Sequence, residues 1–294
     1  MDEQTKHITR REFIAGAAAG TAGCALLQGC DTLSLLQNPD LRFVHITDSH
    51  TDIAKPVTFK WLDKFVRKVN TEYSGVDFVL VGGDNFNNNA SDKDDALRFK
   101  RIMGTLKMPY YAVRGNKEAS PKPAGTPLDQ RDFDNLFFNQ RGMRVNGRDW
   151  KIEKGNYTIL GIDTTITGHG NGIFTKKSLD FVENELKRNP GRHHILLNHQ
   201  TYLNFWGGTE NKDIHKYVIN NVEEVKKRLF KYDNLAMTLS GHKHVDNITK
   251  IGHVDVVSTI GFIVPNNGNP DDHRFRYVRM KNGEINTQRL VSIL

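Results

Sequence analysis

From residue 41 onward, short apolar runs alternate with segments of helical periodicity, and this alternation limits the possible folds more than any other feature. The apolar runs are rich in β-branched or aromatic residues and end in polar residues or glycine, as buried strands do. They cover residues 41–46, 76–81, 110–113, 157–162, 194–197 and 235–239. Apolar side chains at helical spacing cover residues 56–72, 92–106, 176–187 and 222–232. The pattern predicts an α/β fold with largely parallel central strands.

Two regions depart from this alternation. Residues 119–130 contain three prolines and one glycine, which predicts a long irregular loop. The tail, residues 247–294, offers strand-like pieces such as 254–260 and 275–280, joined by Gly, Asn and Pro turns. There we expect antiparallel hairpins that complete a second sheet. Without internal repeats, residues 41–294 are predicted to form one domain.

The first thirty residues have the features of a targeting segment. Residues 9–14 (TRREFI) resemble the twin-arginine export motif. The weakly hydrophobic stretch 13–27 is about 15 residues long, short of the ~20 that span a bilayer. Residues 26–30 (LLQGC) resemble a lipoprotein cleavage box with Cys30 as the lipidated residue. The alternative is an ordinary N-terminal helix with a chance arginine pair.

These features predict a twin-arginine signal peptide at 1–29, a lipidated tether at 30–40 and a folded domain at 41–294. The expected partners are the twin-arginine export machinery and a bacterial membrane, with the protein on the periplasmic or cell-envelope side. Both cysteines, Cys24 and Cys30, precede the domain, so no internal disulfide is expected.

The chain is basic, with a net charge of +7 that removal of residues 1–29 leaves unchanged. A basic surface could attract nucleic acid, anionic lipid or phosphate-bearing substrates. Because no block of Lys and Arg with interleaved aromatics is present, nucleic acid is not favoured. A small phosphate ester or a lipid head group is the preferred partner.

Polar clusters stand where five of the predicted strands end, and ligands gather at the carboxyl ends of strands in α/β sheets. In an extended segment, two residues spaced two apart project to the same side, so Asp48 and His50 could reach one metal ion. The candidate metal ligands are Asp48, His50, Asp84, Asn116, His199, His242 and His244.

In chain order these clusters resemble the signature of the calcineurin-like metallophosphoesterase superfamily over about residues 41–265. The matching segments are Asp48-Ser49-His50, Gly83-Asp84, Gly115-Asn116-Lys117-Glu118, His199 and Gly241-His242-Lys243-His244. The resemblance implies an α/β fold, a four-layer α/β/β/α sandwich of two facing mixed β-sheets flanked by helices. It also implies two divalent metal ions, one held by Asp48, His50 and His244, the other by Asn116, His199 and His242, with Asp84 bridging. Mn, Fe, Zn and Co all suit such ligands.

The implied activity is hydrolysis of phosphoric esters. Two ions about 3.5–4 Å apart clamp a phosphate and lower the pKa of a bridging water, whose hydroxide attacks phosphorus. Lys117 stands where the family usually has histidine. A lysine, with an ordinary pKa near 10.4, protonates a leaving group poorly but still presents positive charge.

We therefore expect Lys117 to stabilise charge on diesters or pyrophosphates rather than on simple monoesters. The alternatives are a Lys117 that points into solvent and a metal- or phosphate-binding lipoprotein that has lost turnover. Asp52, Asn85 and Asn87 stand beside the ligands and are candidates for hydrogen-bond partners that orient them. Further candidates are a substrate contact (His169) and an apolar wall of the pocket (Tyr202, Phe205, Trp206). Segments 119–148 and 200–216 are expected to set substrate specificity.

Overall fold

The computed structural model describes residues 40–87, 93–119, 129–205 and 216–294. The predicted signal peptide, most of the tether with Cys30, part of the proline-rich loop and Trp206 lie outside these ranges. Asp40–Leu294 forms one compact unit. Within the described residues, no helix combines the length and the apolar character needed to cross a membrane.

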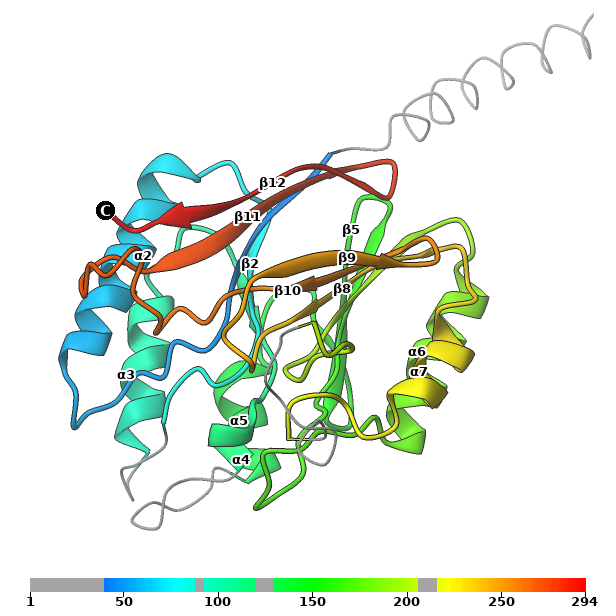
Figure 1. Ribbon diagram of the computed structural model, residues 1–294, viewed down its shortest axis with the longest axis horizontal. Coiled ribbons are helices and arrows are strands. Elements are labelled where there is room, and N and C mark those ends of the chain that lie inside the picture. The colour runs from blue at the N-terminus through cyan, green and yellow to red at the C-terminus, as the bar shows by residue number, and fades with distance from the viewer. Residues whose placement is uncertain (1–39, 88–92, 120–128, 206–215) are drawn as a thin grey trace, which may run out of the picture. The chain divides into compact units, whose positions relative to one another are not determined.

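The first sheet has five strands in the order β12-β11-β1-β2-β3 (Figure 1). Parallel pairing joins β1, β2 and β3, whereas β11 pairs antiparallel with β1 and β12 antiparallel with β11. The strands are β1 (Leu41–Ile46), β2 (Phe78–Val81), β3 (Tyr110–Ala112), β11 (Arg274–Lys281) and β12 (Glu284–Ser292). Its helices are α2 (Val57–Glu72), α3 (Asp94–Met103), the short α4 (Asn116–Ala119) and α5 (Gln130–Phe137).

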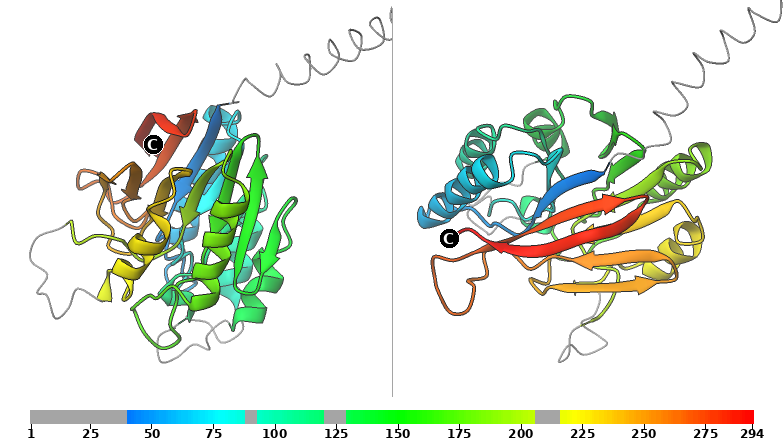
Figure 2. Two further views of the ribbon diagram at one scale, coloured as in Figure 1. Left: turned by 90° about the vertical axis from the view of Figure 1, so that its right-hand side faces the viewer. Right: turned by 90° about the horizontal axis from the view of Figure 1, so that it is seen from above.

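The second sheet has seven strands in the order β4-β5-β6-β7-β8-β10-β9 (Figure 2). The run β6-β7-β8-β10 is parallel, and the strands toward both edges are antiparallel. The strands are β4 (Arg144–Asn146), β5 (Asp149–Lys154), β6 (Tyr157–Gly161), β7 (His193–Leu197), β8 (Leu235–Ser240), β9 (Asn247–Ile251) and β10 (Val254–Ser258). Its helices are α6 (Lys176–Arg188) and α7 (Val222–Leu229).

Three apolar clusters hold these layers together. In β1, Phe43 joins the cluster between the two sheets, while its neighbour Val44 joins the cluster under α2, α3 and α5, because successive strand residues face opposite sides. On the far side of the second sheet, Leu196 packs against Leu179 of α6 and Val225 of α7. The four-layer α/β/β/α sandwich is therefore confirmed.

The tail differs from the prediction that its hairpins complete a second sheet, because they are divided between the two sheets. Strands β9 and β10 extend the seven-stranded sheet, whereas β11 and β12 return to β1 in the other sheet. The local sequence pattern predicts the hairpins. The sheet that each hairpin joins depends on which strand edge is unpaired, and that is decided by the tertiary structure. The structure also adds α4, α5, β4 and β5, which the sequence reading did not specify.

Candidate metal centre

All seven predicted ligand residues meet at the carboxyl ends of strands from both sheets. Asp48 and His50 follow β1, Asp84 follows β2, and Asn116 begins α4 after β3. From the opposite sheet, β7 leads into His199, and β8 leads into His242 and His244. The ligands thus come from two facing sheets rather than from the edge of one.

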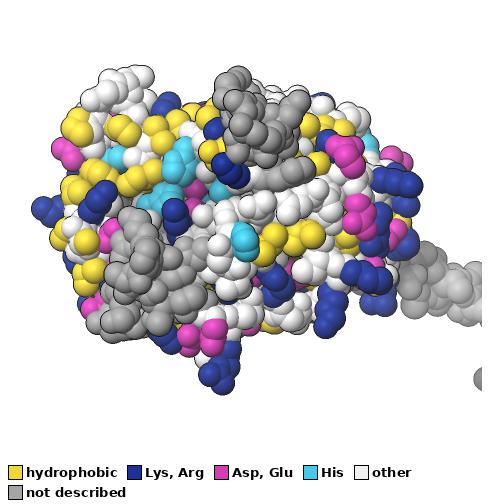
Figure 3. Space-filling view, turned by 60° about the horizontal axis from the view of Figure 1, so that its bottom comes forward, with side chains coloured by type: hydrophobic (Ala, Val, Ile, Leu, Met, Phe, Trp, Pro, Cys, Tyr) yellow, Lys and Arg dark blue, Asp and Glu magenta, His cyan; other side chains and the backbone are white. Residues whose placement is uncertain are grey.

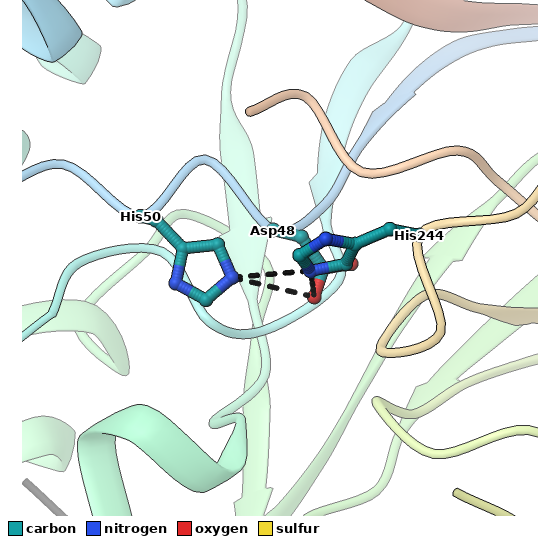
Figure 4. Close-up of side chains that lie close together, drawn as sticks. All are labelled: Asp48, His50 and His244. Carbon is teal, nitrogen blue, oxygen red and sulfur yellow. Dashed lines mark hydrogen bonds and ion pairs between the residues drawn. The ribbon is translucent and has the colours of Figure 1, made fainter. Parts of the chain in front are cut away.

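The first group consists of Asp48, His50 and His244 (Figure 4). His50 Nε2 lies 3.2 Å from His244 Nε2 and 3.9 Å from Asp48 Oδ1. His244 Nε2 lies 3.1 Å from the same Asp48 oxygen. Three potential ligand atoms therefore point at one small volume.

The second group gathers around His199, which is fully buried. His199 Nε2 lies 3.1 Å from His242 Nδ1 and 3.1 Å from Asn116 Oδ1. Asp84 Oδ1 completes the group at 3.4 Å from His199 Nε2. This set, like the first, offers only nitrogen and oxygen ligand atoms.

Asp84 lies between the two groups. Its Oδ1 faces His199 of the second group, and its Oδ2 lies 3.8 Å from His50 Nε2 of the first. A single carboxylate thus presents one oxygen to each group. The backbone amide of Lys117 donates to Asp84 Oδ1 at 2.7 Å and helps to hold this orientation.

Hydrogen bonds on the outer side of three histidine rings assign their tautomers. His50 Nδ1 donates to Asn87 Oδ1 at 2.9 Å, and His199 Nδ1 donates to the Gly82 carbonyl at 2.9 Å. His242 Nε2 donates to the Lys216 carbonyl at 2.7 Å. Because a neutral imidazole has one donor nitrogen, the inner nitrogens carry lone pairs.

These inner lone pairs test whether metal ions fit the site. The inner nitrogens of His199 and His242 face each other at 3.1 Å, and that of His50 faces a nitrogen of His244 at 3.2 Å. Between neutral rings such lone pairs repel unless a cation lies between them, and without a metal ion a proton on His199 takes that place. With carboxylate and amide oxygens beside them and no thiolate, the donor set fits Mn, Fe, Zn or Co. The residues therefore fit two divalent cations.

The pKa values of the ligand residues also favour positive charge in the cluster. Burial alone would lower the pKa of His199, but the carboxylates of Asp84 and Asp48 raise it to about 10. Burial and the positive charge of His199 lower the pKa of His242 to about 4. Although burial opposes ionisation, His199 and His50 lower the pKa of Asp84 to about 2. The carboxylates of Asp84 and Asp48 thus stay ionised and draw positive charge into the cluster.

The backbone at the ligands is not extended, contrary to the expectation for Asp48 and His50. Their φ angles are +54° and +44°, and Asp84, His242 and His244 also have positive φ. Left-handed conformations are uncommon for residues other than glycine and gather at functional sites. Tight left-handed turns, rather than the alternation of a strand, therefore aim these side chains at the cluster.

Glu118 has a role that its sequence motif does not reveal. Its fully buried carboxylate accepts backbone N–H bonds from Asn85 at 2.6 Å, Gly115 at 2.7 Å, Asp84 at 3.1 Å and Phe86 at 3.3 Å. One side chain thus joins the loop after β2 to the loop after β3. Its place in the motif was visible, but the identity of its donors depends on how the two loops meet.

A second connection, also not foreseen, joins the two sheets beside the site. Asp163, which follows β6, lies 3.1 Å from Arg114 Nε and 2.6 Å from Arg148 Nη2. Arg114 follows β3 of the other sheet and directly precedes the Gly115-Asn116 motif. This buried ion pair therefore fixes the distance between the sheets where the ligands converge.

The three residues predicted to orient the ligands, Asp52, Asn85 and Asn87, divide into two roles. Asn87 donates through Nδ2 to Asp52 Oδ2 at 2.9 Å while its Oδ1 accepts from His50, so Asp52 orients a ligand through Asn87. Asn85 instead donates to the Val113 carbonyl and connects two loops.

A cavity of about 490 Å³ opens over the cluster. Its lining comprises His50, Asp84, Asn116, Lys117, Gly168, His169, Gly170, Asn171, Lys216, Tyr217, His242 and His244. Figure 3 shows histidine side chains gathered beside lysine or arginine side chains on this face. Lys117 and His169 thus line the cavity, whereas Tyr202 is buried beside Phe174 and Phe230 and belongs to the core.

Comparison with known proteins identifies a family and several relatives. The model of the family described as calcineurin-like phosphoesterase matches residues 41–246. The chain is 22% identical over 232 residues to the 3',5'-cyclic adenosine monophosphate phosphodiesterase CpdA of Haemophilus influenzae, covering 76% of this chain and 77% of that protein. It is 22% identical over 207 residues to a probable glycerophosphodiester phosphodiesterase, GpdQ, of Arcobacter nitrofigilis, covering 68% of this chain and 71% of that protein.

Solved structures share the fold at low sequence identity. A dimetal phosphatase from Danio rerio superposes with a TM-score of 0.65 at 12% identity, covering 86% of this chain and 98% of that chain. The purple acid phosphatase PPD1 of yellow lupin superposes with a TM-score of 0.53 at 14% identity, covering 87% of this chain and 54% of that chain. The family match covers most of the chain and includes every residue of both ligand groups. The chain belongs to the calcineurin-like phosphoesterase family and is a hydrolase that acts on phosphoric esters.

Proposed function

We propose that this hydrolase uses a dinuclear metal centre to cleave phosphodiester or pyrophosphate bonds in preference to simple monoesters. The observation that carries the proposal is the orientation of Asp84, whose two oxygens face different ligand groups. A carboxylate in this position suits a bridge between two cations. The rings of His50, His199 and His242 are held by hydrogen bonds on their outer side, so that their inner nitrogens also face the proposed ion sites.

In this proposal Asp48, His50 and His244 hold one ion, and Asn116, His199 and His242 hold the other. Two divalent ions supply charge neutralisation of the phosphate and activation of water at neutral pH. The protein supplies the orientation. The carbonyls of Gly82 and Lys216 and the Asn87 amide fix the rings, and Glu118 holds two ligand loops together.

The preference for diesters or pyrophosphates rests on Lys117 and on the relatives. Lys117 lines the cavity, where its ammonium can stabilise negative charge on the phosphate oxygens. An ammonium gives up its proton less readily than an imidazolium, so esters that need no protonated leaving group are favoured. The two relatives compared by sequence, CpdA and the probable GpdQ, are also described as phosphodiesterases.

Metal removal tests the proposed centre. The chelated full chain is expected to lose hydrolysis of bis(p-nitrophenyl) phosphate and to regain it as Mn is added back, with about two ions per chain at full activity. Elemental analysis and a colorimetric assay measure the two quantities on one sample. Two bound ions without hydrolysis of any diester or pyrophosphate would instead indicate a binding protein.

Replacement of Lys117 by alanine is expected to reduce turnover of bis(p-nitrophenyl) phosphate about 100-fold, since one charge that stabilises the transition state is removed. The backbone amide that donates to Asp84 stays in place, so metal content should not change. Lys117→Arg should retain most of the activity, and Lys177→Ala, an exposed position on α6, serves as the control. Unchanged turnover in Lys117→Ala for all esters would remove the proposed role.

We also propose export by the twin-arginine route and lipid anchoring through Cys30, because of residues 9–14 and 26–30. Stable anchoring requires more than one acyl chain. The paired change Arg10→Lys and Arg11→Lys should keep the protein in the cytoplasm, and Cys30→Ala should move it from the membrane to the soluble fraction. Cell fractionation with immunoblotting measures both, and unchanged distributions in both variants would contradict the proposal.

A further inference from the structure

A second cavity, of about 310 Å³, lies at the opposite end of β1 from the metal centre. Its lining includes Arg42, Arg279, Arg289, Tyr73, Tyr277 and Thr287, and we call it the arginine cleft. Arg42 and Asp48 are six residues apart, so along a strand the two sites are separated by about 20 Å. In Figure 1 this end of β1 lies beside the β11–β12 hairpin.

Strand register places like charges next to each other in the cleft. Arg42 of β1 is directly opposite Arg279 of β11, and Arg279 is opposite Thr287 of β12. Arg289 follows two residues after Thr287 and therefore lies on the same face. Like charges directly opposite each other destabilise a sheet. An anion bound between Arg42 and Arg279 would reduce this repulsion.

Two tyrosine rings hold the guanidinium of Arg289. The Arg289 guanidinium lies 5.9 Å from the ring centroid of Tyr73 and 5.6 Å from that of Tyr277. Its Nη2 also donates to the Tyr73 hydroxyl at 3.2 Å. These contacts orient Arg289 without neutralising its charge, which leaves a planar donor group available for bidentate bonds.

Nearby carboxylates do not cancel this charge. Among the described lining residues, Glu72 is the acidic one, and it pairs with Lys68 at 3.1 Å. Asp40 accepts from both Nε and Nη2 of Arg279, with Nε at 3.0 Å, and lies 3.9 Å from Arg42 Nη2. Its single charge therefore pairs mainly with Arg279, and the charges of Arg42 and Arg289 remain. The cleft therefore keeps a net positive charge.

We propose that the arginine cleft is a binding site for a phosphate group, separate from the metal centre and without hydrolytic function. Guanidinium forks match the oxygens of a phosphate, and the hydroxyls of Thr287 and Tyr73 add neutral donors. The phosphate belongs either to the head group of an anionic phospholipid or to a soluble phosphate ester. Asp40, where the preceding part of the chain is attached, contacts two arginines of the site.

The test compares the metal-loaded full chain with the Arg42→Gln/Arg289→Gln double variant in two arms. One arm measures binding to phosphatidylcholine vesicles with and without phosphatidylglycerol, and the other measures calorimetric binding of inorganic phosphate. Arg98→Gln is the matched control, since Arg98 also covers an aromatic ring, Phe59 at 4.3 Å, on another surface. Both arms are repeated in an Asp84→Asn background, which is expected to weaken phosphate binding at the metal centre.

The double variant is expected to bind at least one of the two probes about tenfold more weakly, with unchanged hydrolysis of bis(p-nitrophenyl) phosphate. Loss in the vesicle arm identifies a lipid head group, and loss in the phosphate arm alone identifies a soluble ester. The difference should persist in the Asp84→Asn background. Equal binding by the wild type, the double variant and Arg98→Gln in both arms would overturn the proposal.

Discussion

Replacement of Asp84 by asparagine is expected to lower hydrolysis of bis(p-nitrophenyl) phosphate by roughly 10³-fold or more and to reduce the metal content of the purified chain. Asp84 is 2% exposed, and its two oxygens face different ligand groups. The amide of asparagine keeps one oxygen but loses the negative charge and presents an N–H donor to one group. The change should therefore weaken both proposed ion sites together.

Steady-state kinetics and elemental analysis on the same preparation check this expectation. Asp233→Asn is a matched control, because Asp233 is exposed and precedes β8, whereas His242 and His244 follow the opposite end of that strand. The control should keep wild-type turnover and metal content. If Asp84→Asn kept two ions and wild-type turnover, the proposed bridging role would be wrong.

Replacement of Gly115 by alanine should be strongly destabilising, because the added methyl group meets backbone beside the site. A Cβ at Gly115 would overlap the backbone nitrogen and Oδ1 of Asp84, and lie 2.9 Å from the Gly83 carbonyl carbon. Since Glu118 and Lys117 also hold this region, the loop cannot move away freely. We expect a loss of about 3 kcal/mol in the free energy of unfolding and a fall in Tm of roughly 6–12 °C.

Urea titration and thermal unfolding, each with metal bound and after chelation, measure the loss. Gly191→Ala adds the same methyl group where nothing lies within 4 Å, so its stability should stay within about 0.5 kcal/mol of the wild type. Metal binding should weaken in Gly115→Ala but not in Gly191→Ala, because only the methyl group at position 115 overlaps Asp84. A fully stable, metal-replete Gly115→Ala would show that these loops are less tightly packed than described.

The sequence was sufficient for the fold class because burial patterns are local. The run at β1 is apolar on both faces, and the structure places Phe43 between the sheets and Val44 against the helices. The same local reading was wrong for the backbone of Asp48 and His50, which turn through left-handed conformations. Such conformations depend on contacts that no strand pattern contains.

Contacts between distant residues also explain what the sequence could not assign. Glu118 was visible in its motif, but its four N–H donors lie in two loops that meet only in the folded protein. Hairpins in the tail were expected, yet their division between two sheets depends on which strand edges are open.

For this protein, the sequence by itself determined the α/β class and the family signature, because side-chain type and order along the chain are sufficient for both. The tertiary structure decided which atoms face each other. His50 and His244 are 194 positions apart, and their nitrogens meet at 3.2 Å because two sheets face each other. The orientation of Asp84 between the two groups and the clustering of Arg42, Arg279 and Arg289 arise in the same way, from the pairing of strands and loops remote in sequence.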